Sequence, residues 1–189
     1  LGAKGNSLQA DVRHENFMVS TGTSLQDAGL LQDGAEVWFS ILHKIAASHS
    51  SRADWAFALA DNGLLYTTGG PHYVHSQKTG IGFSVRGTDS LTAGVWTSGV
   101  ATPVESSAYD LTPTDTEFGQ TIMIVGKMTW GADASSADTV DLYLPDTMMN
   151  LGDVVATSSG VIDQSFLDLI TIGGARYNHS SVPLYMDEI

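Results

Sequence analysis

The chain has 189 residues, with 21 Asp and Glu against 8 Lys and Arg, and its formal net charge of −13 disfavours nucleic acids and anionic membranes as partners. No cysteine is present, which excludes disulfides and thiolate metal sites, and the apolar runs are too short and too interrupted to predict a membrane span. The length fits one all-β domain over residues 1–189. Because the first residue is Leu1 and not Met, we expect a processed or trimmed chain.

The first quarter of the chain predicts strands separated by a turn. A Gly- and Ser-containing start, Leu1–Leu8, leads into an expected edge strand and then the turn-like segment Leu25–Gly34. Glu36–Leu42 follows and alternates between apolar and polar residues, which is typical of a half-buried strand. Its two faces carry Val37, Phe39 and Ile41 on one side and Glu36, Trp38 and Ser40 on the other. The apolar residues from Ile41 to Ala46 would also suit a helix.

The middle of the chain has a similar ambiguity. Asp54–Ala60 alternates large apolar residues with alanine, although its spacing also fits a helix. We favour a strand, because Asn62-Gly63 is a hairpin-type turn that leads into a short strand at Leu64–Thr67. Short strands are also expected at Ile81–Arg86 and Gly94–Ser98. A long loop is expected over Val100–Gln120, which is rich in Ser and Thr and contains two prolines.

The last third predicts three strands: Thr121–Gly131, Asp138–Pro145 and Val182–Ile189. One face of the first is apolar. In the second, Asp141 and Tyr143 alternate with leucine and valine. Residues expected on the apolar faces are Ile122, Ile124, Met128, Trp130, Val140, Leu142 and Leu144. This pattern predicts an all-β fold of two packed sheets.

Several strings, in this order, resemble the concanavalin A-like jelly-roll domains, and most closely the laminin-G-like modules of bacterial secreted and surface proteins. They are Gly5-Asn6-Ser7-Leu8, Glu36–Leu42, Gly80-Ile81-Gly82-Phe83, Ile124–Trp130, Asp138–Pro145 and Tyr185–Ile189. The resemblance covers nearly the whole chain and implies a two-sheet jelly-roll sandwich at the cell surface or outside the cell. Family members usually continue one strand beyond such an ending. We therefore expect a final strand that is clipped or completed by other residues, with an edge open to another chain.

The resemblance implies lectin-like binding, adhesion or glucanase activity with paired carboxylates. The Glu-x-Asp-x-x-Glu string of such glucanases is absent, and the five glutamates leave only a dyad drawn from different strands. The sequence therefore favours a non-catalytic recognition module for carbohydrate or adhesion. Two alternatives remain open: a structural subunit of a surface layer or filament, and a glycoside hydrolase.

Ligand-binding candidates are aromatic and acidic side chains on polar strand faces. Sugars pack their C–H faces on exposed rings and pair their hydroxyls with polar groups, which selects Trp38, Tyr143 and Asp141. Partial burial under a loop is the alternative for both rings. Trp55 and Trp130 lie on apolar faces and are expected in the core, and Trp96 stays undecided.

Calcium is the one cofactor that the sequence suggests. Asp residues gather in the stretches around the second of the three late strands, and hard cations bind several such oxygens. The candidates are Asp133, Asp138 and Asp146. Aspartates that only stabilise turns are the alternative.

Overall fold

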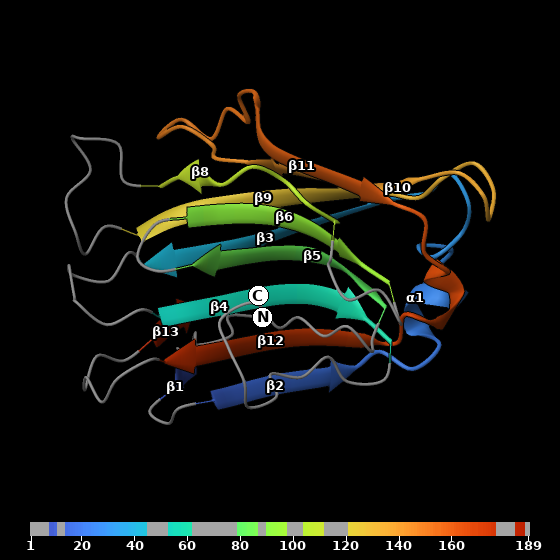
Figure 1. The fold of residues 1–189 in the computed structure, drawn as a ribbon, viewed down its shortest axis with the longest axis horizontal. Helices are drawn as coiled ribbons and strands as arrows, with labels where there is room; N and C mark the ends of the chain where they lie inside the picture. Colours follow the sequence, from blue (N-terminus) through green and yellow to red (C-terminus); the bar gives the residue numbers. More distant parts are fainter. Residues whose placement is uncertain are drawn as a thin grey trace.

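The computed structural model describes residues 8–10, 14–44, 53–61, 79–86, 90–97, 104–111, 121–176 and 184–187. In these segments the chain forms two antiparallel sheets, with one short α-helix and one short 3-10 helix (Figure 1). The prediction of an all-β fold with two packed sheets is confirmed.

The six-stranded sheet carries most of the strands predicted with the clearest alternation. Its strand order is β1-β13-β3-β9-β10-β11. The bounds are β1 (Leu8–Ala10), β13 (Leu184–Asp187), β3 (Glu36–Lys44), β9 (Thr121–Thr129), β10 (Asp138–Tyr143) and β11 (Val154–Gly160). The last described strand, β13, lies between β1 and β3 and pairs with Leu42 and His43 of β3.

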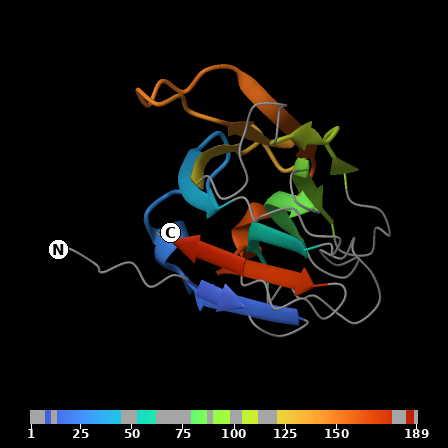
Figure 2. The same cartoon turned by 90° about the vertical axis from the view of Figure 1, so that its left-hand side faces the viewer.

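The seven-stranded sheet has the order β2-β12-β4-β5-β6-β7, and β8 also pairs with β6. The bounds are β2 (His14–Ser20), β12 (Leu169–Arg176), β4 (Ala53–Ala60), β5 (Gly80–Arg86), β6 (Ser90–Trp96), β7 (Val104–Glu105) and β8 (Tyr109–Asp110). The helix α1 (Ser24–Asp27) and the 3-10 helix η1 (Gln164–Phe166) lie in connections. Viewed from the side, β2 and the β10–β11 connection lie at opposite edges of the molecule (Figure 2).

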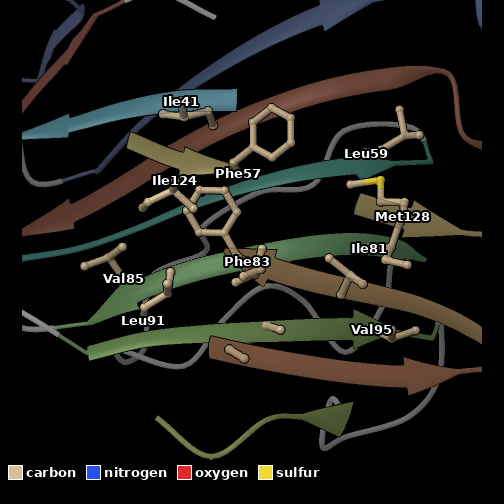
Figure 3. Close-up of a cluster of buried hydrophobic side chains, with 14 of the residues drawn as sticks. Ile41, Phe57, Leu59, Ile81, Phe83, Val85, Leu91, Val95, Ile124 and Met128 are labelled. Carbon is tan, nitrogen blue, oxygen red and sulfur yellow. The ribbon is translucent and has the colours of Figure 1, made fainter. Parts of the chain in front are cut away.

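The core fills the space between the sheets. Side chains at alternate positions of β3, β9 and β10 meet those of β4, β5 and β6, as Figure 3 shows for Ile124 and Met128 against the opposite sheet. Three phenylalanines join the layers. The ring of Phe39 lies 4.6 Å from that of Phe57 and 5.9 Å from that of Phe83, measured between centroids. Aromatic rings at such separations add to the stability that area burial provides.

Alternation predicts the inward faces correctly. Ile41 is buried, while Glu36, Trp38 and Ser40 are exposed on the other face of β3. In the two later strands the predicted apolar faces are also inward, and five of their residues are fully buried: Ile124, Met128, Trp130, Val140 and Leu142. The helix alternatives for β3 and β4 are wrong.

Two predictions of local structure need correction, and two strands were not predicted. The segment 25–34 contains the end of α1, and Val100–Gln120 contains the two-residue strands β7 and β8, which are too short to produce a visible period. The sequence interpretation also missed β11 and β12. The inward positions of β11 are Ala156 and Ser158, so that strand lacks apolar contrast. The turn at Asn62-Gly63 and the strand at Leu64–Thr67 lie outside the described residues.

Candidate functional site

The outer face of the six-stranded sheet carries a row of polar and aromatic side chains across four strands. Register places Trp38 of β3 opposite Lys127 of β9, Lys127 opposite Asp141 of β10, and Asp141 opposite Thr157 of β11. Side chains at directly paired positions of adjacent strands lie close together on the same face of the sheet. The row is therefore a continuous strip across the sheet, here called the outer row.

Trp38 and Tyr143 lie together on this face. Their ring centroids are 5.9 Å apart and the planes differ by 24°, which is a stacked arrangement. Trp38 is 50% exposed, whereas Tyr143 is only 9% exposed. The prediction that both rings face outward is therefore confirmed in orientation, but Trp38 presents the larger accessible surface. Tyr143 stacks against the indole.

A charged pair, Lys127 and Glu36, lies near the indole of Trp38. The Lys127 Nζ lies 5.7 Å from the centroid of the Trp38 ring, within the range of a cation–π interaction. The same Nζ lies 3.5 Å from Oε1 of Glu36, in a half-exposed ion pair. Such surface pairs contribute little to stability, so their effect here is to orient the indole and the lysine.

Asp141, the third predicted ligand residue, is held in place on the outer row. Its Oδ1 accepts a hydrogen bond of 2.7 Å from the Thr157 Oγ1. The second carboxylate oxygen accepts no hydrogen bond from the described residues. The structure therefore brings all three predicted ligand residues onto one face, where Asp141 lies two strands from the exposed Trp38 ring.

Sequence reasoning missed Lys127 and Thr157. Both are polar residues at outward positions, so their alternation along β9 and β11 is the signal that identifies them. For Lys127 that signal was present in the predicted strand. For Thr157 it was not, because β11 itself was missed.

Trp130 and Trp96 serve packing. Trp130 is 1% exposed, and its Nε1 donates to the Leu30 carbonyl at 2.5 Å. Trp96 is buried on the outer face of the seven-stranded sheet, where its ring lies against Gly94. The core prediction for Trp130 is confirmed and the open question for Trp96 is answered. The side chain of Trp55 lies outside the described residues.

The three calcium candidates are not brought together. Asp138 is buried at the start of β10, and its two oxygens accept the N–H groups of Gly131 and Ile162, each at 2.9 Å. Asp146 lies past the other end of that strand and accepts three hydrogen bonds from Met148 and Asn150. In the described segments no group of three or more His, Cys, Asp or Glu is placed to hold a metal ion.

Asp133 has a local role in the β9–β10 turn. Its Oδ1 accepts hydrogen bonds from Ser135, through both N–H and hydroxyl, and from the Ser136 hydroxyl. These bonds stabilise the charged form and lower the pKa of Asp133 to about 2. Hydrogen bonds from Asn150 likewise lower the pKa of Asp146. Both carboxylates therefore stay ionised and organise their turns.

Comparisons with known proteins do not assign the chain to a family. No protein-family model matches the chain, and no curated protein matches its sequence. Among solved structures, a protein of unknown function from Shewanella oneidensis MR-1 is similar with a TM-score of 0.48 and 11% identity, over 96% of this chain and 70% of that one. That score is too low to carry an argument. In the segments described, no helix is long and apolar enough to cross a membrane.

Proposed function

We propose that the chain is a non-catalytic, extracellular recognition module that binds carbohydrate on the outer row. The observation that carries this proposal is the half-exposed Trp38 ring, which stacks on Tyr143 and lies near Lys127, with Asp141 one strand further along the outer row. A pyranose can place its C–H face on the indole while its hydroxyls reach the lysine donor and the free carboxylate oxygen. No covalent step is needed for this function.

We also propose that the sandwich is a concanavalin A-like jelly roll. The strand orders support this, because half of the neighbouring pairs along the two sheet orders join strands that are distant in sequence, such as β13 beside β3 and β12 beside β4. Such crossing between the sheets is what two interleaved Greek keys produce. The sequence strings that resemble the family add support from an independent source.

A glycan array followed by isothermal titration calorimetry tests the carbohydrate proposal. We expect saturable binding of at least one glycan class and about fivefold weaker binding by Trp38→Ala, since a lost aromatic contact costs about 1 kcal/mol. Trp38→Phe should retain part of the affinity because it keeps a flat ring. Tyr109→Ala is the matched control, because Tyr109 is an exposed aromatic residue in the other sheet.

Two results would overturn the proposal. One is silence across the array and the titrations. The other is binding that Trp38→Ala leaves unchanged, which would place the ligand elsewhere. Release of reducing sugar during the titrations would instead support the hydrolase alternative.

A structural subunit of a surface layer or filament is the second candidate function. The strand β11 is an edge of the six-stranded sheet, and Met148, Met149 and Val154 beside it are 77%, 63% and 44% exposed. An edge strand next to exposed apolar side chains can pair with another chain. Sizing chromatography separates the two candidates: a monodisperse monomer favours the binding module, and large assemblies favour the subunit.

A further inference from the structure

A cleft of about 790 Å³ lies at one end of the sandwich, distinct from the outer row. Its walls come from the turn before β3, the residue before β5, the residue after β6, the β9–β10 turn and the segment that follows β11. Figure 1 shows α1 and the segment after β11 gathered at this end of the sheets. The volume lies within the range of small-molecule sites.

Hydrogen bonds from the body of the fold hold three walls of the cleft. The Trp130 indole N–H binds the carbonyl that precedes Leu31. The buried Asp138 carboxylate accepts the N–H of Ile162. On the third side, Asp61 exchanges two bonds with Thr79: its N–H donates to the Thr79 carbonyl, and its Oδ1 accepts the Thr79 N–H, both at 3.0 Å. The cleft is therefore preformed, which lowers the entropic cost of binding.

The chemistry of the lining combines an apolar floor with a polar rim. Leu31 and Ile162 are buried apolar side chains that line the cleft. Gln164, only 7% exposed, also lines it, and its Nε2 donates to Oδ1 of Asp33 at 2.7 Å. The Gln164 amide thus holds the Asp33 carboxylate in position at the cleft. Polar groups held in this way orient ligands in small-molecule sites.

Among the described residues, the charged side chains of the lining are both negative. They are Asp33 and Asp163, and none of the described Lys or Arg residues lines the cleft. One oxygen of each is occupied: Oδ1 of Asp33 by Gln164, and Oδ1 of Asp163 by the N–H and hydroxyl of Ser165. Within the described part of the chain, Oδ2 of both carboxylates accepts no hydrogen bond. An anion is repelled here, and a cationic group finds two acceptors.

We propose that this cleft binds a saccharide unit that carries a protonated amine. The apolar floor suits the C–H face of a sugar ring, the hydroxyl of Thr97 suits a sugar hydroxyl, and the two carboxylates suit the ammonium group. A bare metal ion fits less well, because two carboxylates fall short of the oxygen set that calcium requires. The cleft does not share residues with the outer row, so this inference does not depend on the proposed function of Trp38.

Three oligosaccharides of equal length test the proposal: a glucosamine trimer, its N-acetylated neutral form and a uronic acid trimer. Binding is followed by amide chemical shifts in ¹H–¹⁵N NMR spectra, at a pH where the amines are protonated. We expect the glucosamine trimer to shift amides of residues 161–165 and to bind most tightly, the neutral trimer to bind more weakly, and the uronic acid trimer not to bind there. Each Asp-to-ammonium contact should contribute about two- to fivefold in affinity and weaken with added salt.

Variants localise the effect. Asp33→Asn and Asp163→Asn should each reduce the preference for the glucosamine trimer over the neutral one, and Ala134→Arg, at an exposed position in the lining, should abolish cleft binding by adding a cation. Asp153→Asn is the matched control: it removes the same charge at an exposed position before β11, outside the cleft. Trp38→Ala should leave the shifts at 161–165 unchanged. Equal binding of the cationic and neutral trimers at the cleft, or no shift there with any trimer, would overturn the proposal.

Discussion

Gly126 lies directly opposite Phe39 in the β3–β9 ladder, and the Phe39 ring occupies the space that a side chain at position 126 would need. A Cβ built on Gly126 would overlap three ring carbons of Phe39, including Cζ. Because Phe39 faces the core, its neighbour Trp38 faces outward along the alternation of the strand. Gly126 therefore leaves room for Phe39 on the inward face of β3, and the alternation of that strand then places Trp38 of the proposed binding site on the outward face.

Gly126→Ala should destabilise the protein by about 1–3 kcal/mol, the usual cost of overpacking a core. In a strand without this contact, replacing Gly by Ala would stabilise the protein by about 0.5–1 kcal/mol. The sign of the change in stability therefore shows whether Phe39 fills this space. Urea unfolding measures the difference. The double variant Gly126→Ala with Phe39→Leu should cost less than the sum of the single variants, since the smaller side chain makes room for the methyl group. A Gly126→Ala protein as stable as the wild type would show that Phe39 moves aside freely.

The strands with strong alternation were predictable, and the site only in part. Glu36–Leu42 and Asp138–Pro145 contrast large apolar with polar residues, so their faces and the outward direction of Trp38 follow from period two alone. The strand β11 could not be found in this way, because small and hydroxyl side chains fill its inward positions. The end cleft was beyond sequence reasoning altogether. Asp33 and Gln164 are 131 positions apart and meet only through the tertiary fold.

Asp138→Ala should destabilise the protein by about 3 kcal/mol. The buried carboxylate accepts the N–H groups of Gly131 and Ile162, and its removal leaves two buried donors without an acceptor. Asp138→Asn should also destabilise, because its amide replaces one acceptor with a donor that faces an N–H group. Thermal and urea unfolding measure both variants, with Asp153→Asn as an exposed control near zero. Loss of less than about 0.5 kcal/mol in Asp138→Ala would contradict this structural role.

The calcium prediction for Asp133, Asp138 and Asp146 leads to a thermal test. Any ion that binds only the folded chain raises its melting temperature by mass action. The prediction therefore expects a higher melting temperature in calcium than in chelator, and a smaller difference in Asp133→Asn and Asp146→Asn if those carboxylates are ligands. Melting curves that coincide in calcium and in chelator would contradict the prediction.

His43 should make the stability of the protein depend on pH. It lies on the inward face of β3, is 5% exposed, and burial lowers its pKa from 6.5 to about 4. Between these two values the unfolded chain binds a proton at this position and the folded chain does not. The free energy of unfolding is therefore at its full value above pH 6.5 and falls as the pH drops toward about 4, by a total of about 3 kcal/mol.

A non-titrating variant isolates this contribution. His43→Gln should flatten the dependence on pH between 6.5 and 4, whatever its effect on the absolute stability, when urea unfolding is measured across a pH series. The Asp133 carboxyl does not interfere, since its pKa is lowered from 3.8 to about 2 and its stabilisation is lost only as the pH falls through that lower range. If the wild type and His43→Gln lose stability equally between pH 6.5 and 4, another group causes the loss and burial of neutral His43 is not the reason.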